Sequence, residues 1–120
     1  MSNDNRRSVE RYRSELALRL QADGLPVTLR RDDRLRLDPI YREAGDLWGL
    51  PDWSVITRNE APRNLLEGVT EARQAAGADG KKFYAAAWSA RTRHPEDSLF
   101  VLDTRTFAAL VRDTTNWSRD

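Results

Sequence analysis

Cysteine is absent from this chain of 120 residues, and histidine and methionine occur once each. The lack of cysteine excludes disulfide bonds and thiolate metal sites, and one histidine cannot form a His-rich zinc site. That histidine, His94, stands in the loop sequence TRHPED, where a solvated surface residue is expected more often than a catalyst. Because no glycine-rich phosphate-binding loop occurs either, carboxylates are the residues left to carry chemistry.

Long apolar runs are missing as well. No stretch approaches the roughly 18 apolar residues that a membrane helix needs, and the first residues, MSNDNRRSVERYRSE, lack the apolar core of a signal peptide. Apolar residues make up 39% and charged residues 32% of the chain, which is typical of a folded soluble domain. We therefore expect one domain over residues 1–120, with 114–120 as a frayed tail and the cytoplasm as its location.

Lysine is scarce, since Lys81 and Lys82 are the only lysines among the 20 basic residues. Arginine pairs bidentately with phosphate, but arginine richness is also typical of a GC-rich genome, and both interpretations stay open. Interspersed acids bring the formal net charge to only +1, so the basic pattern is weak evidence for a nucleic-acid partner. The arginines that we consider for nucleic-acid binding are Arg30, Arg31, Arg34 and Arg36.

Hydrophobic periodicity predicts helices over residues 4–22, from Asn64 to the turn at 77–80, and from Asp103 or Thr104 through Val111. Alternating or β-branched runs predict strands. They cover 27–37 as one strand or a short hairpin, 52–59, 81–90 and a short buried strand at 99–103. The order is helix, two or three strands, helix, strand, strand, helix. It predicts a single α/β or α+β domain with a mixed sheet flanked by helices.

Among the carboxylates, Asp46 is the first candidate for chemistry. It lies a few residues before the strand predicted at 52–59, so a turn could bring it beside that strand. Two or more acids on adjacent strands hold Mg²⁺ for phosphodiester hydrolysis. An acid that follows a glycine is usually a turn residue, so its position alone leaves both roles open.

The stretch GDLWGLPDWSVITRNE, residues 45–60, resembles the active-site segment of the PD-(D/E)XK nuclease superfamily. It is most similar to small Holliday-junction-resolvase-like endonucleases of actinobacterial phages and their hosts, which read G-D-[IL] and then G-L-P-G-W-[ST]-[IV]-E-x-K-N-x. Residues 5–27, 64–77 and 97–111 resemble the flanking helices and closing strand of the group. The resemblance implies a minimal nuclease core, Mg²⁺ as cofactor and DNA as substrate or partner.

Two of the positions that carry the family's chemistry depart from its pattern. Its metal-binding glutamate falls on Ile56, which has no donor atom, and its lysine falls on Arg58, which cannot act as a base because arginine stays protonated. Arg58 could still stabilise charge in a transition state. In an extended strand Glu60 shares a face with Arg58, although it lies about 13 Å from position 56 at ~3.3 Å per residue. The catalytic candidates are therefore Asp46, Arg58 and Glu60, with Asp46 as the metal ligand.

Two functions follow from the resemblance. The favoured one is a catalytically degenerate, phage-type nuclease-fold protein that binds nucleic acid or a host protein that handles it. It is favoured because two of the three core residues are changed. The alternative is an active Mg²⁺-dependent endonuclease that resolves junctions with a displaced acid, for which Glu15 of the first helix is a further candidate. Such resolvases are usually dimers because a junction is two-fold symmetric, so a homodimer stays open, although no heptad or apolar patch indicates one.

Overall fold

The helical spacing of apolar residues in the first segment yields one long helix, α1 (Ser2–Ala22), in the computed structural model of the chain. The structure describes residues 2–29, 43–91 and 94–115. The other elements are β1 (Thr28–Leu29), β2 (Leu47–Trp48), β3 (Trp53–Arg58), α2 (Leu65–Asp79), β4 (Phe83–Trp88), the short 3₁₀ helix η3 (Pro95–Asp97), β5 (Leu99–Val101) and α3 (Thr104–Thr115). The helices and the strands β1, β3, β4 and β5 follow the predicted order, whereas β2 and η3 were not predicted.

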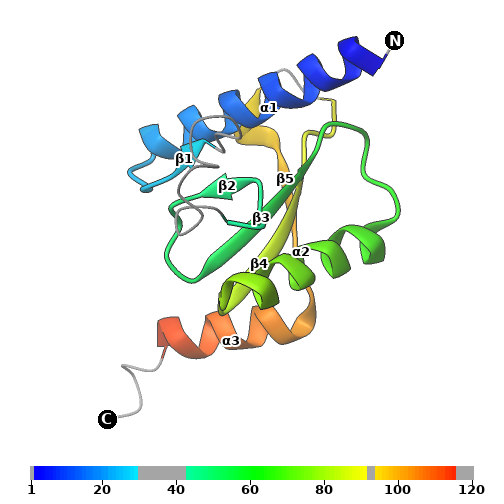
Figure 1. Cartoon of the computed structure of the whole chain (residues 1–120). Coiled ribbons are helices and arrows are strands. Elements are labelled where there is room, and N and C mark those ends of the chain that lie inside the picture. Colours follow the sequence, from blue (N-terminus) through cyan, green and yellow to red (C-terminus); the bar gives the residue numbers. More distant parts are fainter. Residues whose placement is uncertain (1, 30–42, 92–93, 116–120) are drawn as a thin grey trace.

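The five strands form one sheet in the order β1-β2-β3-β4-β5. Strands β3 and β4 run parallel, and the other neighbours are antiparallel. A parallel pair needs a crossover connection, which α2 supplies. Helix α1 covers one face of the sheet, and α2 and α3 lie across the other (Figure 1). The described chain is a single α+β domain with a mixed sheet flanked by helices, which confirms the predicted class.

Successive residues of a strand point to opposite faces, and this alternation divides the core into two layers. On one face Val55 packs with Tyr12 and Leu16 of α1. On the other face Ile56 and Trp88 pack with small and branched residues of α2. Neighbouring residues of β3 therefore belong to different layers, and this decides which side chains can share a site.

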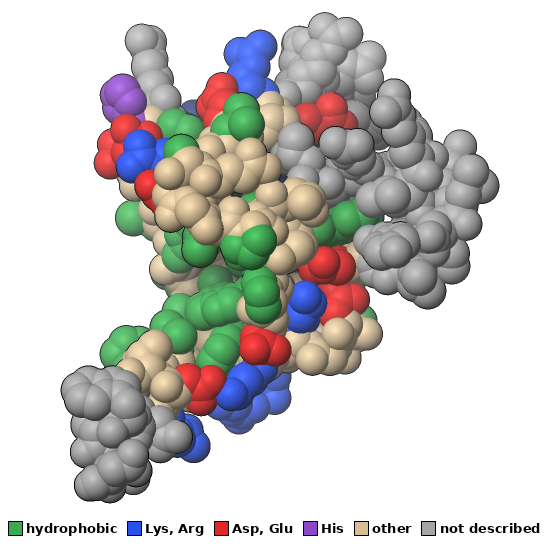
Figure 2. Space-filling view, turned by 90° about the vertical axis from the view of Figure 1, so that its left-hand side faces the viewer, with side chains coloured by type: hydrophobic (Ala, Val, Ile, Leu, Met, Phe, Trp, Pro, Cys, Tyr) green, Lys and Arg blue, Asp and Glu red, His purple; other side chains and the backbone are tan. Residues whose placement is uncertain are grey.

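Two details of the predicted elements are wrong. Asn64 stands at the start of α2, but its backbone is left-handed (φ 52°) and its side chain makes no capping hydrogen bond. Strand β5 was expected to be buried, yet it pairs only with β4 among the described strands, and Leu99 and Phe100 are 48% and 43% exposed. Figure 2 shows further hydrophobic side chains gathered in the lower half of the molecule, where α3 lies.

The ends of the predicted segments also shift. Helix α3 continues to Thr115, so it includes the first two residues of the expected frayed tail, and residues 116–120 lie outside the described part. Of the strand or hairpin predicted over 27–37, the structure describes only β1 and the residue before it. Among the described helices, none combines the length and the apolar character that crossing a membrane requires.

Of the two residues expected to start α3, Asp103 and Thr104, Asp103 is the one that caps it. Its Oδ1 accepts a hydrogen bond from the Thr106 N–H (2.9 Å), and its Oδ2 accepts one from the Tyr84 hydroxyl (2.6 Å). Although burial acts to raise the pKa of the Asp103 carboxyl, these hydrogen bonds and nearby Arg105 outweigh it and hold the pKa below its ordinary value. The ionised form of Asp103 thus joins β4 to α3.

Replacing either glycine of α2 by alanine should change the stability of the protein, but in opposite directions. A Cβ on Gly68 would lie 2.4 Å from Cη2 of Trp88, whereas nothing lies within 4 Å of a Cβ on Gly77. Overpacking costs about 1–3 kcal/mol, so we expect Gly68→Ala to lower the free energy of unfolding. Gly77→Ala should raise it by up to about 1 kcal/mol, because alanine favours helix. Urea unfolding measures both, and equal effects would contradict the close approach of α2 to Trp88.

Asp103 should make the stability of the protein pH-dependent. Because its pKa is lowered on folding, its contribution is fully present above the unfolded-state pKa of about 4 and is lost as the pH falls through the folded-state pKa. The uncharged variant Asp103→Asn should therefore have a lower urea midpoint than wild type at pH 7. The two midpoints should converge as the pH is lowered towards 3. A difference that stays constant with pH would show that the charge of Asp103 does not contribute.

Candidate functional site

The connection between β2 and β3 explains most of the small residues of the GDLWGLPDW motif. A Cβ on Gly45 would lie 2.8 Å from Oγ of Ser54, and Gly49 has φ +86° with a backbone carbonyl 2.5 Å from where its Cβ would be. Pro51 is followed by Asp52 at φ 63°, which fits a type II turn with proline and a left-handed residue at its centre. The spacing of these residues is therefore set by backbone geometry.

Charged side chains fasten this hairpin to the turn between α2 and β4. The N–H of Gly49 donates to Oε2 of Glu43 (3.0 Å), and Nζ of Lys81 lies 3.5 Å from Oε1 of the same carboxylate. Asp79 accepts a hydrogen bond from the Ala44 N–H (2.7 Å). The hairpin is held from both sides, so the position of Asp46 within it is well defined.

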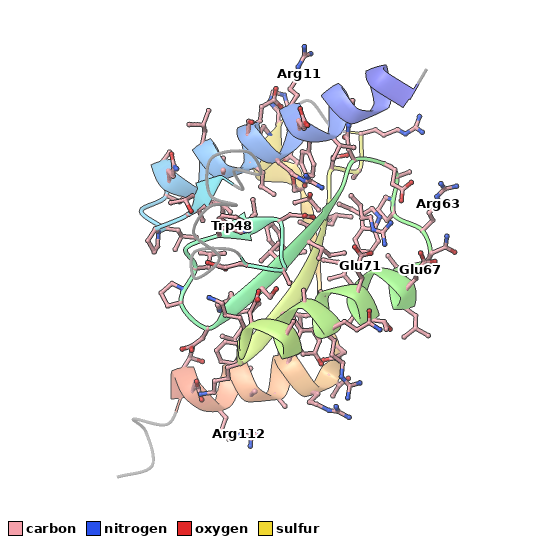
Figure 3. All side chains as sticks on the ribbon, in the orientation of Figure 1. Arg11, Trp48, Arg63, Glu67, Glu71 and Arg112 are labelled. Carbon is pink, nitrogen blue, oxygen red and sulfur yellow. The ribbon has the colours of Figure 1, made fainter. Side chains whose placement is uncertain are left out.

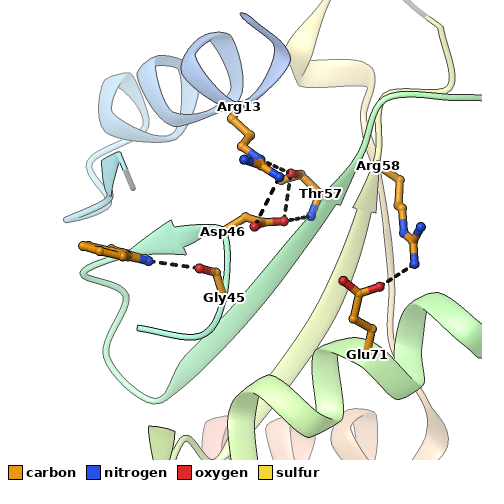
Figure 4. Close-up of polar contacts among 7 residues, drawn as sticks. Arg13, Gly45, Asp46, Thr57, Arg58 and Glu71 are labelled. Atoms are coloured by element: carbon orange, nitrogen blue, oxygen red, sulfur yellow. Dashed lines mark hydrogen bonds and ion pairs between the residues drawn. The ribbon is translucent and has the colours of Figure 1, made fainter. Parts of the chain in front are cut away.

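Asp46 is buried, with 8% of its surface exposed, and its carboxylate is bound by groups from two elements. Oδ2 accepts hydrogen bonds from the Thr57 N–H (2.7 Å) and the Thr57 hydroxyl (3.1 Å). Oδ1 lies 3.4 Å from Nη2 of Arg13, whose Nε donates to the Thr57 hydroxyl (2.8 Å). Figure 4 shows the three side chains converging between α1 and β3. We call Arg13, Asp46 and Thr57 the carboxylate network.

The two positions that depart from the family pattern lie on the other face of the sheet. Ile56 is buried in the layer beneath α2. Arg58 turns the same way, because its Nη2 donates to Oε2 of Glu71 (2.5 Å) and lies 3.9 Å from Oε1 of Glu67. Figure 4 shows this pair apart from the carboxylate network. The motif resemblance groups Arg58 with Asp46 in one site. The residue of β3 that contacts Asp46 is instead Thr57.

The other candidates lie away from Asp46. Strand β3 ends at Arg58, so Glu60 is not in the extended strand that was expected, and its carboxylate pairs with Arg63 (3.1 Å). Glu15 is exposed on α1, and the residue of α1 that reaches Asp46 is Arg13. The arginines proposed for nucleic-acid binding all lie outside the described residues: Arg30, Arg31, Arg34 and Arg36.

Mg²⁺ prefers several oxygen ligands in near-octahedral geometry. Among the described residues no three acidic, histidine or cysteine side chains are grouped so that they could hold a metal ion. The groups of the described residues that contact the Asp46 carboxylate include a guanidinium, an N–H and a hydroxyl, and the guanidinium opposes a second cation there. The described surroundings of Asp46 do not fit a Mg²⁺ site.

Arg58 and Glu60 line an open pocket where β3 ends. Its volume is about 410 Å³, and it is lined by Ser8, Val9, Thr57, Arg58, Asn59, Glu60 and Arg91. Thr57 belongs both to this pocket and to the carboxylate network. Sequence reasoning did not select Arg13, Thr57 or Arg91. For Thr57 the alternation of β3 was an available guide, whereas no pattern ties the distant Arg13 and Arg91 to the motif.

Comparison of the chain with protein-family models, with curated proteins and with solved structures finds no match. The interpretation of the site therefore depends on its own geometry and on the resemblance of the motif.

The carboxylate network predicts that Asp46 stabilises the fold. Asp46→Ala would leave the buried Thr57 N–H without its acceptor, and a hydrogen bond to a charged group contributes about 1.5–3 kcal/mol. We expect the free energy of unfolding of Asp46→Ala, measured in urea, to be about 2–3 kcal/mol lower than that of wild type. The value for Asp46→Asn should lie between those of wild type and Asp46→Ala. The control is Glu10→Ala, an exposed acid of α1, which should change it by less than about 0.5 kcal/mol. Higher stability in Asp46→Ala would instead indicate a carboxylate kept for function at the expense of stability.

Proposed function

We propose that this chain is a nuclease-fold protein that binds nucleic acid without hydrolysing it. The observation that carries the proposal is the engagement of Asp46, the acid that the motif assigns to the metal, by Arg13 and Thr57. An active Mg²⁺ site needs that carboxylate together with further oxygen ligands. Here a positive side chain from α1 lies beside it, and the glutamate position of the motif, Ile56, belongs to the core.

The arrangement of the elements supports a nuclease-like core. The mixed sheet has α1 on one face and α2 on the other, and β3 continues through α2 into the parallel β4. This agrees with the order of elements that the motif resemblance implies. The motif covers β2 and β3, the two strands that lie next to each other in the sheet.

Exposed arginines supply the contacts to phosphate. Arg11 projects outwards from α1 and Arg63 from the loop before α2 (Figure 3). Arg91 lies exposed at the pocket. Guanidinium groups bind phosphate bidentately, and a protein that neutralises several phosphates binds more weakly as salt rises. The arginine-rich sequence over residues 30–36 is a further candidate for phosphate contacts, which we call the contact segment. Its arginines are Arg30, Arg31, Arg34 and Arg36.

Binding can be measured by fluorescence anisotropy with labelled single-stranded, duplex and four-way-junction DNA in EDTA. We expect metal-independent binding whose affinity falls steeply between 50 and 200 mM salt. Replacing Arg30 and Arg31 together by glutamate should abolish it. The matched control reverses Arg73 and Arg112, which are exposed on α2 and α3, and should retain most of the affinity. If no DNA form binds, or if both pairs lose binding equally, the proposed contact segment is wrong.

The same proteins should be incubated with these DNA forms in Mg²⁺ and in Mn²⁺. Wild type is expected to leave every substrate intact. Metal-dependent cleavage that disappears in Asp46→Asn would favour the alternative, an active endonuclease in which Arg13 gives way to the metal.

A further inference from the structure

We propose that the pocket at the end of β3 binds a phosphate monoester of mononucleotide size, held between the guanidinium groups of Arg58 and Arg91. The monoester belongs either to a free nucleotide or to the phosphorylated end of a nucleic-acid strand. In its strand-end form this inference rests on the proposed function.

The size and lining of the pocket indicate a small polar ligand. Its volume of about 410 Å³ lies in the range of sites that hold small molecules, about 300–1,000 Å³. Such sites are usually lined by apolar side chains, but here Val9 is the one apolar residue that lines the pocket. Hydroxyl, amide and guanidinium groups form the rest together with one carboxylate, so hydrogen-bond donors prevail and the pocket suits a ligand rich in acceptors.

The charges of the lining favour an anion. Arg58 and Arg91 contribute two positive charges, and Glu60 is the single carboxylate in the lining. Arg63 pairs with Glu60 from outside the pocket. The acids of α2 that pair with Arg58 do not line the pocket. Because Glu71 offsets part of the Arg58 charge, Arg91 is the main source of positive charge in the lining.

Arg58 also has an unmet donor. Its Nη2 is bound to Glu71, but its Nε is buried and has no hydrogen-bond partner among the described residues. A buried polar donor without a partner is costly and calls for an explanation such as a ligand or a water molecule. Because this Nε is closed to solvent, a phosphate oxygen could accept from its N–H only after the Arg58 side chain shifts within the pocket.

Arg91 lies across the pocket and is positioned by its backbone. Ala90 and Arg91 both have left-handed backbones, with φ of 53° and 56°, and non-glycine residues in this conformation persist only where the surroundings hold them. The Ser89 N–H donates to the Arg58 carbonyl (2.9 Å) and the Ala90 N–H to the Glu60 carbonyl (3.1 Å). This turn is thereby fixed to the end of β3, and the Arg91 guanidinium makes no ion pair among the described residues.

Two guanidinium groups match the charge of a monoester better than that of an internal phosphodiester. A monoester carries about −1.5 to −2 charges at pH 7 and three free oxygens. A diester carries one charge and offers two. Each arginine can therefore take a separate oxygen of a monoester in a charge-assisted hydrogen bond.

The test uses the full chain and follows the Arg Nε–Hε signals by ¹⁵N NMR during titration. The probes are inorganic phosphate, adenosine 5′-monophosphate, and one short oligonucleotide with and without a 5′-phosphate. We expect the Arg58 Nε–Hε signal to shift with every phosphate-bearing monoester and not with the unphosphorylated oligonucleotide. Tighter binding of the phosphorylated oligonucleotide than of the monophosphate indicates a strand end as ligand, and the reverse indicates a free nucleotide.

Variants separate a binding role from a structural one. Arg91→Gln should weaken the binding of the monophosphate at least tenfold. The control Arg112→Gln, on α3 far from the end of β3 (Figure 3), should leave the affinity unchanged. Glu60→Gln should tighten binding several-fold, because it removes the carboxylate that repels the anion, and a merely structural role would not give this gain.

Unchanged affinity in Arg91→Gln, or no shift at Arg58 with any phosphate probe, would overturn the proposed pocket. Equal binding of the two oligonucleotides with no response to the monophosphate would also refute it, while the proposed binding of nucleic acid would stand. Response to the monophosphate without binding of any DNA would retain the pocket and refute the proposed function.

Discussion

The fold depends on one carboxylate placed where a short strand ends. Strand β2 has only two residues, so its backbone does not extend to the end of β3. The side chain of Asp46 takes the Thr57 N–H in place of a ladder carbonyl, and the same carboxylate holds Arg13 of α1. A buried N–H left without an acceptor would cost on the order of 1–3 kcal/mol. Asp46 therefore completes the pairing of β3 and also positions α1 on the sheet.

This arrangement gives most residues of the GDLWGLPDW motif a structural role. Gly49, Pro51 and Asp52 shape the turn into β3, Gly45 lies against that strand, and Asp46 completes its pairing. These demands do not extend to Ile56 and Arg58, whose side chains lie on the opposite face. Gly45, Gly49 and Pro51 match the pattern that the motif resembles, whereas Asp52 stands where the pattern has glycine. Ile56 and Arg58 stand where the pattern has the glutamate and lysine of its chemistry.

The sequence was sufficient for the longer elements and their order, because periodic segments such as α1 and the run of β4 are encoded locally, but it did not reveal the two-residue strand β2. The sequence was not sufficient to tell on which face of the sheet each side chain of the motif lies. The alignment of the motif fixed attention on Ile56 and Arg58, but the side of β3 that meets Asp46 depends on where the hairpin turns. The partner of Asp46 was out of reach for a different reason, since Arg13 is brought there by the packing of α1. The exposure of β5 likewise depends on its place at the sheet edge and not on its apolar sequence.

The end of β3 is the point at which the two faces of the sheet meet. Within the strand, alternation keeps Thr57 towards α1 and Arg58 towards α2, but beyond the last strand residue both can border one pocket. An anion beside Asp46 would face a carboxylate and would need a bridging cation. At the end of β3 the guanidinium groups of Arg58 and Arg91 border the pocket, so the phosphate binding proposed there would require no metal. In that proposal the Asp46 carboxylate remains committed to the pairing of β3.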